Sequence, residues 1–240
     1  MREARDEGRR AASAAAPTRA LFVVAKQPAA GQTKTRLCPP LRGEEAAALY
    51  SSFLADTLDI MRQVNDVRCG IAYLPHDGAA YFSALAPEMD LVLQQGDSLG
   101  ERLDHLITHT LTHGATQVVV MDSDSPTLPP GYVAQAFDLL DGDAEAVFGP
   151  CRDGGYYLVG MKRPCPALLR EVEMSTATVL ADTLAIAARE GIRAALLPEW
   201  YDVDTGEELA HLAHELDAAD AAIAHHTLSL IHISEPTRPY

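Results

Sequence analysis

The sequence predicts an α/β fold in which short buried strands of a parallel sheet alternate with amphipathic helices. The segment Gln117 to Pro126 reads QVVVMDSDSP, and its consecutive apolar residues are typical of a strand buried on both faces. Residues 44–61 and 99–111 instead repeat apolar side chains with the period of a helix. The 240 residues are 48% hydrophobic and 22% charged, which suits one large domain with a sizeable core.

The remaining elements follow from short apolar runs, turn residues and capping patterns. Strands are predicted at residues 21–25, 69–74, 90–94, 118–121, 144–148, 156–159 and 192–197. Helices are predicted at residues 44–61, 99–111, 130–140, 176–190 and 206–212. Two of these helices begin at capping boxes, which are the sequences SLGE at residues 98–101 and TGEE at residues 205–208.

Composition excludes several classes of protein. The formal net charge of −15 opposes nucleic-acid binding by phosphate neutralisation, so no nucleic-acid partner is expected. No apolar run is long enough to span a bilayer. The four cysteines form no C-x-x-C pair, which argues against a zinc site or a dense disulfide framework. This cysteine pattern fits a reducing compartment, and the predicted location is the cytoplasm.

The two ends are expected to lie outside the folded domain, which is predicted to span residues 21–227. Residues 1–20 mix arginine, acid and alanine without an apolar segment, so they predict a disordered leader and not a secretory signal. Residues 228–240 read LSLIHISEPTRPY, which looks like a translated sequencing-adapter read-through. We therefore expect this tail to have no role in the fold.

Two carboxylates, Asp122 and Asp124, follow the predicted strand at residues 118–121, and Pro126 ends it. Ligands of open α/β sheets bind beyond the carboxyl ends of strands, where these residues lie. In extended backbone the two side chains project to the same side, so they repel each other unless a cation joins them. This favours Mg²⁺ or Mn²⁺, which carboxylates and substrate phosphates bind together. The alternative is a turn or N-cap that serves the next helix.

A basic loop follows the first strand and reads KQPAAGQTKTRL over residues 26–37. Gly31 permits close backbone approach, and Lys34, Thr35 and Arg36 add two cations and a hydroxyl. Two of the three lysines in the chain, Lys26 and Lys34, lie here. The pattern favours a phosphate-binding loop at a helix start, although the Walker sequence G-x-x-x-x-G-K-[ST] is absent. A solvated basic loop is the alternative.

A glycine-rich segment reads GPCRDGGYYLVG over residues 149–160. Asp153, Gly154 and Gly155 form a permissive tight turn, and Tyr156 opens the strand beyond it. A plain hairpin turn is one interpretation. The Gly-Pro before the turn and the paired tyrosines after it favour a loop that faces a substrate.

Asp202 and Asp204 repeat the i, i+2 carboxylate spacing at a second junction between a strand and a helix. They are candidates for the same cation site. The alternative is that they only place negative charge at the N-terminus of the last predicted helix.

Three motifs in order carry a family resemblance: K-x-P-x-x-G-x-x-K-T-R-L, D-S-D-S-P-T-L and G-P-x-x-D-G-G-Y-Y-L-V-G, with a late D-V-D-T. Over residues 21–212 they resemble DUF2064, a bacterial glycosyltransferase-like family also described as arsenosugar-biosynthesis or radical-SAM-associated transferases. That family is similar to GT-A nucleotide-sugar transferases, and more distantly to phospholactate guanylyltransferases and molybdenum-cofactor nucleotidyltransferases. The resemblance implies a GT-A (nucleotide-diphospho-sugar transferase) α/β/α sandwich with a mixed, mainly parallel sheet.

The resemblance also implies roles for the residues in these motifs. The nucleotide phosphates would be held by Lys26, Gly31, Lys34, Thr35 and Arg36. The metal ion, Mg²⁺ or Mn²⁺, would be held by Asp122, Asp124, Asp202 and Asp204. The substrate loop would comprise Gly154, Gly155 and Tyr156.

The leading hypothesis is a metal-dependent transferase that moves a glycosyl group from an NDP-sugar to a small-molecule acceptor. The predicted catalytic residues are Asp124, which would hold the metal at the departing diphosphate, and Asp153, which would orient or deprotonate the acceptor hydroxyl. The first alternative is a nucleotidyltransferase that releases pyrophosphate from an NTP, although its L-x-G-G-x-x-x-R-M-G-x-x-K loop is missing. The second alternative is a non-catalytic nucleotide-binding protein.

Overall fold

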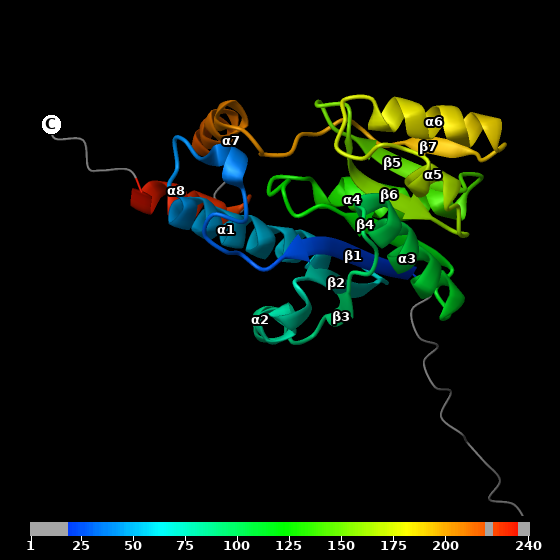
Figure 1. Cartoon of the computed structure of the whole chain (residues 1–240), viewed down its shortest axis with the longest axis horizontal. Helices are drawn as coiled ribbons and strands as arrows, with labels where there is room; N and C mark the ends of the chain where they lie inside the picture. The colour runs from blue at the N-terminus through cyan, green and yellow to red at the C-terminus, as the bar shows by residue number, and fades with distance from the viewer. Residues whose placement is uncertain (1–18, 219–222, 235–240) are drawn as a thin grey trace, which may run out of the picture.

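The computed structural model describes residues 19–218 and 223–234 and contains a seven-stranded sheet with helices on both faces (Figure 1). In spatial order the strands are β3 (Asp90–Leu93), β2 (Arg68–Leu74), β1 (Arg19–Lys26), β4 (Gln117–Met121), β6 (Tyr156–Met161), β5 (Ala146–Pro150) and β7 (Ala194–Leu196). All neighbouring strands pair in parallel except β6, which runs antiparallel to β4 and to β5. The predicted mixed, mainly parallel sheet is confirmed.

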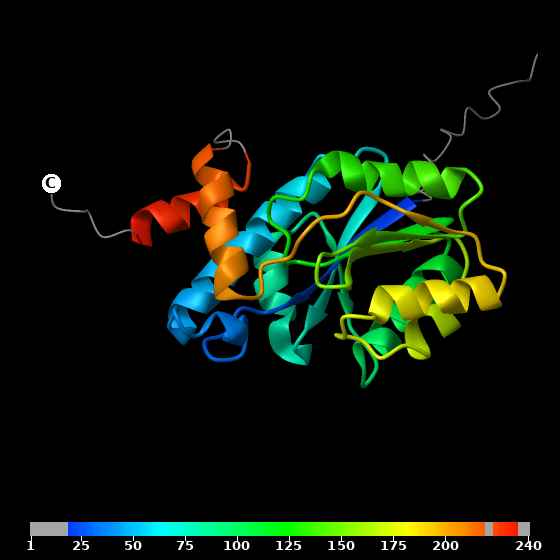
Figure 2. The same cartoon turned by 90° about the horizontal axis from the view of Figure 1, so that it is seen from above.

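Helices cover both faces of the sheet. They are α1 (Gly43–Arg62), α2 (Ala79–Leu85), α3 (Leu99–Thr112), α4 (Pro130–Asp141), α5 (Ala167–Arg170), α6 (Val179–Arg189), α7 (Gly206–Ala218) and α8 (His225–Ser234), with short 3-10 helices η1 (Thr35–Leu37) and η2 (His76–Gly78). Apolar side chains of α1, α2 and α4 form one buried layer, and those of α3, α5 and α6 form the other. Figure 2 shows α4 and α6 on opposite sides of the sheet. This arrangement confirms the α/β/α sandwich.

The central strand β4 shows why its apolar run in the sequence predicts a strand buried on both faces. Its alternate residues point into opposite layers, because Val118 and Val120 belong to the core under α3 whereas Val119 and Met121 belong to the core under α1. A strand buried on both faces needs apolar side chains at every position, which is the pattern that the sequence carries.

Several predicted boundaries shift in the structure. The helix predicted at residues 176–190 begins at Val179, since Ser175 has a left-handed backbone with φ of 65° and a turn precedes the helix. The strand predicted at residues 144–148 begins at Ala146 and continues to Pro150, where its pairing with β6 ends. Helices α2 and α5 were not predicted from the sequence. Within the described residues, no helix combines the length and apolar character needed to cross a membrane.

The structure also corrects the expected domain boundaries. Strand β1 begins at Arg19, so two residues assigned to the leader belong to the sheet, and the rest of that segment, residues 1–18, lies outside the described residues. The expected boundary at residue 227 falls inside α8. Leu228, Leu230 and Ile231 pack, partly buried, against a third core cluster formed by η1, α1 and α7. The expectation that this tail makes no packing contact is therefore wrong for residues 228–231. Residues 235–240 lie outside the description, and the adapter origin of the segment stays a prediction.

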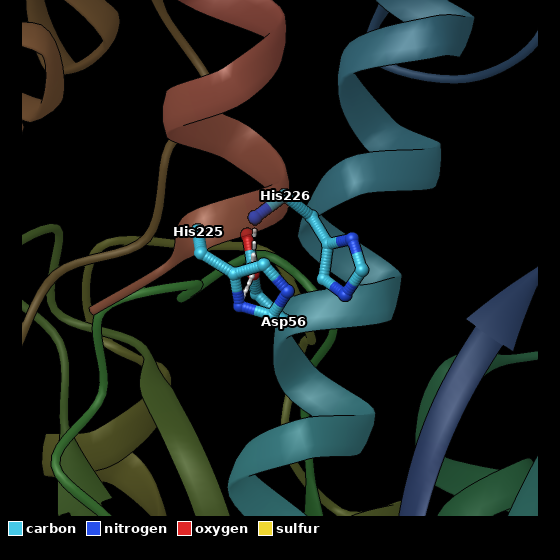
Figure 3. Close-up of side chains that lie close together, drawn as sticks. All are labelled: Asp56, His225 and His226. Atoms are coloured by element: carbon cyan, nitrogen blue, oxygen red, sulfur yellow. Dashed lines mark hydrogen bonds and ion pairs between the residues drawn. The ribbon is translucent and has the colours of Figure 1, made fainter. Parts of the chain in front are cut away.

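A buried carboxylate on α1 joins α8 to the rest of the domain (Figure 3). Asp56 is 2% exposed, and its two oxygens accept hydrogen bonds from the backbone N–H of His226 at 3.0 Å and of Thr227 at 2.9 Å, and from the Thr227 hydroxyl at 2.6 Å. A cap supplied from another helix thus satisfies amides that the first turn of α8 leaves unpaired. His225 also lies close enough to join these residues around a metal ion, but the Asp56 oxygens are already occupied.

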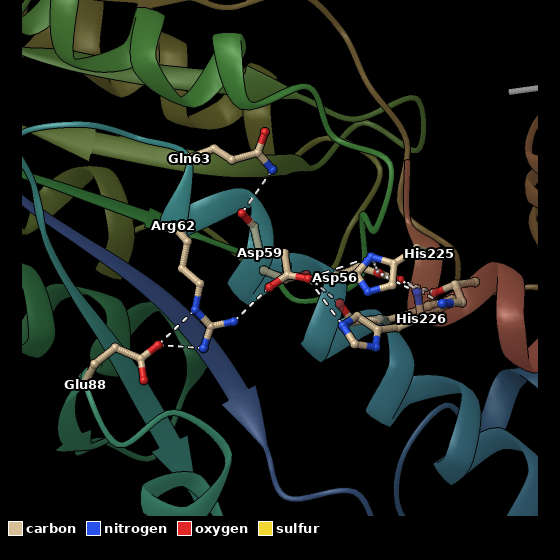
Figure 4. A network of polar contacts seen from close by, with 10 residues as sticks. Asp56, Asp59, Arg62, Gln63, Glu88, His225 and His226 are labelled. Atoms are coloured by element: carbon tan, nitrogen blue, oxygen red, sulfur yellow. Dashed lines mark hydrogen bonds and ion pairs between the residues drawn. The ribbon is translucent and has the colours of Figure 1, made fainter. Parts of the chain in front are cut away.

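The contact between α1 and α8 extends through a polar network (Figure 4). Nε2 of His226 is 3.2 Å from Asp59 Oδ2, and the Arg62 guanidinium bonds both Asp59 and Glu88. The network connects α8 through α1 to the segment that precedes β3.

Candidate active site

The main cavity, of about 470 Å³, opens at the carboxyl ends of the neighbouring parallel strands β1 and β4. The loop after β1 lines it with Lys26, Lys34, Thr35 and Arg36. The turn after β4 contributes Asp122 and Asp124, and Asp204 lies on the same wall. The structure therefore brings four of the five predicted phosphate-binding residues and three of the four predicted metal-binding aspartates to one cavity. This is the edge of the sheet where α/β proteins bind ligands.

The ammonium group of Lys34 lies between two of these aspartates. Its Nζ is 2.9 Å from Asp124 Oδ1 and 2.7 Å from Asp204 Oδ1, and it donates to the Val203 carbonyl at 2.8 Å. Only 5% of the side chain is exposed. Burial lowers the pKa of Lys34, but the carboxylates of Asp124 and Asp204 outweigh burial and raise this pKa above its ordinary value. Lys34 is therefore a buried cation whose contacts connect the loop after β1 to the turn after β4 and to residues 203–204.

The two carboxylates after β4 have different surroundings, because the backbone turns after Met121 instead of remaining extended. Asp122 accepts the Asp124 N–H at 3.2 Å and the Ser125 hydroxyl at 3.1 Å. Burial, together with the nearby charges of Asp124 and Asp202, raises the pKa of Asp122 well above its usual range. Asp122 thus shapes a turn, as the alternative interpretation expected, and it also belongs to an acidic cluster; the cation site stays a prediction.

A second group of acids lies beside this cavity. Ligand atoms of Cys151, Asp153 and Asp202 lie within 4.8 Å of one another. Burial, with the carboxylates of Asp153 and Asp204 next, raises the pKa of Asp202 to about 6. Burial, followed by the neighbouring carboxylates, also raises the pKa of the Cys151 thiol, so this thiol stays protonated. The predicted site thus continues from Asp122 and Asp124 through Asp202 to Asp153.

These oxygen donors fit a hard divalent cation better than a soft one. Asp124 and Asp204 already share the Lys34 ammonium, whereas Asp122, Asp153 and Asp202 make no ion pair within the described residues. Clustered carboxylates suit Mg²⁺ or Mn²⁺, and a protonated thiol is a poor ligand for either. Asp124 and Asp204 are thus held against Lys34, whereas Asp202 has a ligand atom within 4.8 Å of Asp153 and its charge acts on Asp122.

The glycine-rich turn positions Asp153 through its backbone. Gly154 has φ of 91°, and a Cβ atom there would lie 1.9 Å from the Ala177 carbonyl oxygen, so only glycine fits. Oδ1 of Asp153 accepts the Gly155 N–H at 2.8 Å. Tyr156 instead packs on Phe148, and its hydroxyl lies 3.5 Å from Met174 Sδ, so its side chain belongs to the core under α3 and lines neither described cavity.

The loop after β1 uses much of its own backbone for internal hydrogen bonds. The amides of Gln32 and Thr33 both donate to the Ala29 carbonyl, and the amide of Gln27 donates to the Leu74 carbonyl. Gly31 has φ of 72° and turns the chain, but it does not line the cavity. Phosphate recognition by this loop would therefore rest on side chains, chiefly those of Lys34 and of Arg36, whose side chain is 71% exposed.

Sequence reasoning missed several residues that line the cavity. Tyr50 was assigned to the apolar face of a helix, but its hydroxyl lies 2.8 Å from Ser123 Oγ and accepts the Lys26 N–H at 3.1 Å. Burial, followed by the Asp124 carboxylate, raises the pKa of Tyr50 to about 12. Gln94 and Arg102 also line the cavity. The sequence signal that could have identified these three residues is a polar group beside an apolar segment, because a position that is only part of the core would carry an apolar side chain.

Comparisons with solved structures define the class to which the fold belongs. A candidate nucleotide-diphospho-sugar transferase from Desulfovibrio desulfuricans G20 has a TM-score of 0.83 and 31% identity, over 90% of this chain and 94% of that one. CMP:2-keto-3-deoxy-manno-octonic acid synthetase complexed with CTP has a TM-score of 0.56 and 11% identity, over 83% of this chain and 98% of that one. The 4-diphosphocytidyl-2C-methyl-D-erythritol synthase of Anaerococcus prevotii DSM 20548 has a TM-score of 0.55 and 10% identity, over 86% of this chain and 100% of that one. The chain therefore has the fold of nucleotide-diphospho-sugar transferases and cytidylyltransferases.

The family follows from the sequence match. Residues 57–176 match the family described as uncharacterized protein conserved in bacteria (DUF2064), and the chain belongs to that family. The resemblance drawn from the three motifs is confirmed. No curated protein matches the chain.

Proposed function

We propose that the protein is a metal-dependent transferase that takes a glycosyl group from a nucleoside diphosphate sugar. The observation that carries this proposal is the composition of the main cavity, where Lys34 and Arg36 meet Asp122, Asp124 and Asp204 at the carboxyl ends of β1 and β4. The similarity to the D. desulfuricans protein supports the same donor class. The diphosphate would occupy the cationic side of the cavity, where its charge is matched.

The reaction proposed is a displacement at the sugar carbon that bears the diphosphate. The acceptor hydroxyl oxygen forms a bond to that carbon, and the bond from the carbon to the diphosphate oxygen breaks. The electron pair stays on the departing diphosphate, and the hydroxyl proton passes to the Asp153 carboxylate. Mg²⁺ or Mn²⁺, held by Asp122 and Asp202, would neutralise charge on the diphosphate; Lys34 would contribute its positive charge, and Arg36 would donate hydrogen bonds.

A nucleotidyltransferase is the second candidate, because two cytidylyl-transferring enzymes share the fold. That reaction would need a loop shaped around three phosphates. The amides of Gln27, Gln32 and Thr33 are bonded within the protein, and Pro28 has no amide hydrogen. The loop therefore offers few backbone donors for a triphosphate, which favours the glycosyl-transfer proposal.

The test compares two products. The protein is incubated with a panel of NDP-sugars and Mg²⁺ or Mn²⁺, and nucleoside diphosphate release is followed by chromatography. Pyrophosphate release from NTPs is measured in parallel with phosphorylated sugars and small acids. Slow NDP release that needs the metal and disappears in Asp202→Asn, which removes a proposed metal ligand, would support the proposal. Pyrophosphate without NDP would assign nucleotidyl transfer, and neither product, with nucleotide binding intact, would assign the non-catalytic alternative.

A further inference from the structure

A second cavity, of about 360 Å³, lies beside the proposed donor site. Asp153 and Asp202 line it, whereas Asp204 lines the main cavity. The extended segment at residues 201–205 therefore separates the two cavities, with the acidic cluster at their junction. Given the proposed function, a molecule in the second cavity would sit next to Asp153, on the far side of the cluster from the nucleotide. This is the position that an acceptor needs.

The second cavity carries more negative than positive charge. Its lining includes four carboxylates, those of Asp153, Asp202, Glu207 and Glu208, and one guanidinium, that of Arg152, besides His211. Glu208 is held in place because it accepts the Asp204 and Thr205 amides, both at 2.7 Å. The Arg152 guanidinium carbon lies 5.3 Å from the centre of the Tyr201 ring, and its Nε is 3.9 Å from Glu199 Oε1. An anionic ligand would meet net repulsion here.

The aromatic ring of Tyr201 also lines this cavity. Tyr201 is 4% exposed, and its hydroxyl contacts Thr127 at 3.2 Å and also bonds Glu215. The ring stacks on Trp200, with centroids 5.6 Å apart and planes 28° apart, and meets the His211 ring edge to face. Because Trp200, His211 and Arg152 also cover this ring, the carboxylates supply most of the groups that a ligand would contact, and they match a compound rich in hydroxyl donors.

We infer that the second cavity binds the acceptor, and that the acceptor is a polyhydroxylated compound without negative charge. Its hydroxyl groups would donate to the carboxylates of Asp153 and Glu207. A phosphorylated or carboxylated acceptor would bring its anion against four carboxylates. The cavity therefore selects uncharged polyols and amino sugars over sugar phosphates and hydroxy acids. That the bound compound is an acceptor rests on the proposed function, but the binding preference can be measured without turnover.

Trp200 offers a direct readout, because it is the single tryptophan of the chain and its ring stacks on Tyr201. Tryptophan fluorescence is titrated with uncharged hexoses, cyclitols and alditols, with their amino derivatives and with their phosphates, in the presence of saturating nucleoside diphosphate and Mn²⁺. We expect at least one uncharged or amino compound to bind at least tenfold more tightly than its phosphate. The inference is overturned if no uncharged or amino compound binds, or if the phosphates bind more tightly.

A charge-reversal variant links this preference to the cavity. Glu207→Lys changes an exposed acid in the first turn of α7, and Glu44→Lys changes an exposed acid in the first turn of α1, outside both cavities. The two substitutions perturb helix N-termini alike, so Glu44→Lys controls for stability. The preference for uncharged over phosphorylated compounds should fall about tenfold or more in Glu207→Lys and stay unchanged in Glu44→Lys. An equal preference in both variants would place the binding site elsewhere. Absence of NDP release from NDP-sugars would instead count against the proposed function, whatever the fluorescence shows.

Discussion

Replacing Asp202 by asparagine should stabilise the metal-free protein at neutral pH, although it removes a predicted ligand. Burial and two neighbouring carboxylates raise the pKa of Asp202 from 3.8 to about 6. The folded protein thus holds this proton more tightly than the unfolded chain does. The resulting contribution to stability is fully present below pH 3.8 and is lost as the pH rises through about 6. Two pKa units correspond to about 3 kcal/mol, and partial exposure of the carboxylate reduces the expected effect to about 1 kcal/mol.

The assay is urea unfolding of wild type and Asp202→Asn with a chelator present, at several values between pH 4 and pH 8. The gain in the free energy of unfolding should be near zero at the acid end and should reach about 1 kcal/mol above pH 6. Asp138→Asn, at an exposed position of α4, is the matched control. With Mn²⁺ in place of the chelator the order should reverse, since wild type alone keeps the full ligand set. Parallel pH profiles for wild type and Asp202→Asn would refute this account of the acidic cluster.

Three further tests, two of them with a control variant, address other parts of the structure. Lys34→Met should cost about 2 kcal/mol of unfolding free energy, because it leaves two carboxylates without their buried cation, whereas the exposed Arg36→Met should cost under about 0.5 kcal/mol; both should weaken diphosphate binding in calorimetry, and equal stability losses would contradict the burial argument. Gly154→Ala should lower the melting temperature by several degrees, while Gly131→Ala, in open space on α4, should raise or preserve it. Asp56→Ala should cost about 1–2 kcal/mol through loss of the α8 cap, and an unchanged urea midpoint would show that α8 does not contribute to stability.

The position of the acidic groups could be predicted because it depends on local pattern. A doubly buried strand followed by Asp122 and Asp124 places carboxylates at the ligand-binding edge of any parallel sheet, whatever the rest of the fold. The detail of their geometry could not be predicted in the same way. The expectation of extended backbone failed because Asp122 bonds the amide two residues ahead and turns the chain. Local hydrogen bonding thus determines the backbone conformation at residues 122–124, which the hydrophobic pattern of the sequence does not specify.

The state of Lys34 could not be predicted from its neighbours in the sequence. A polar, glycine-containing loop predicts an exposed lysine side chain, and substituting an exposed lysine would have little effect on stability. In the structure its side chain is 5% exposed, and its partner Asp204 lies 170 residues further along the chain. Only the packed fold brings these two residues together. Tyr50 is a similar case, because its helix face was predicted correctly but its hydroxyl reaches Ser123 across the core.

The charge balance of the site explains why these residues should act together. Within the described residues, the ion pairs of the acidic cluster come from Lys34, which is buried, and Arg36, which is exposed. A diphosphate that entered alone would meet the carboxylates of the main cavity as well as its cations, so its binding should be weaker than in the presence of a divalent cation. A divalent cation would offset the charge of the carboxylates, and the diphosphate would complete its coordination. Each ligand therefore strengthens binding of the other by the same factor, as linkage requires. We therefore expect Lys34 to hold the carboxylates together in the protein alone, and a bound metal ion to strengthen nucleotide binding.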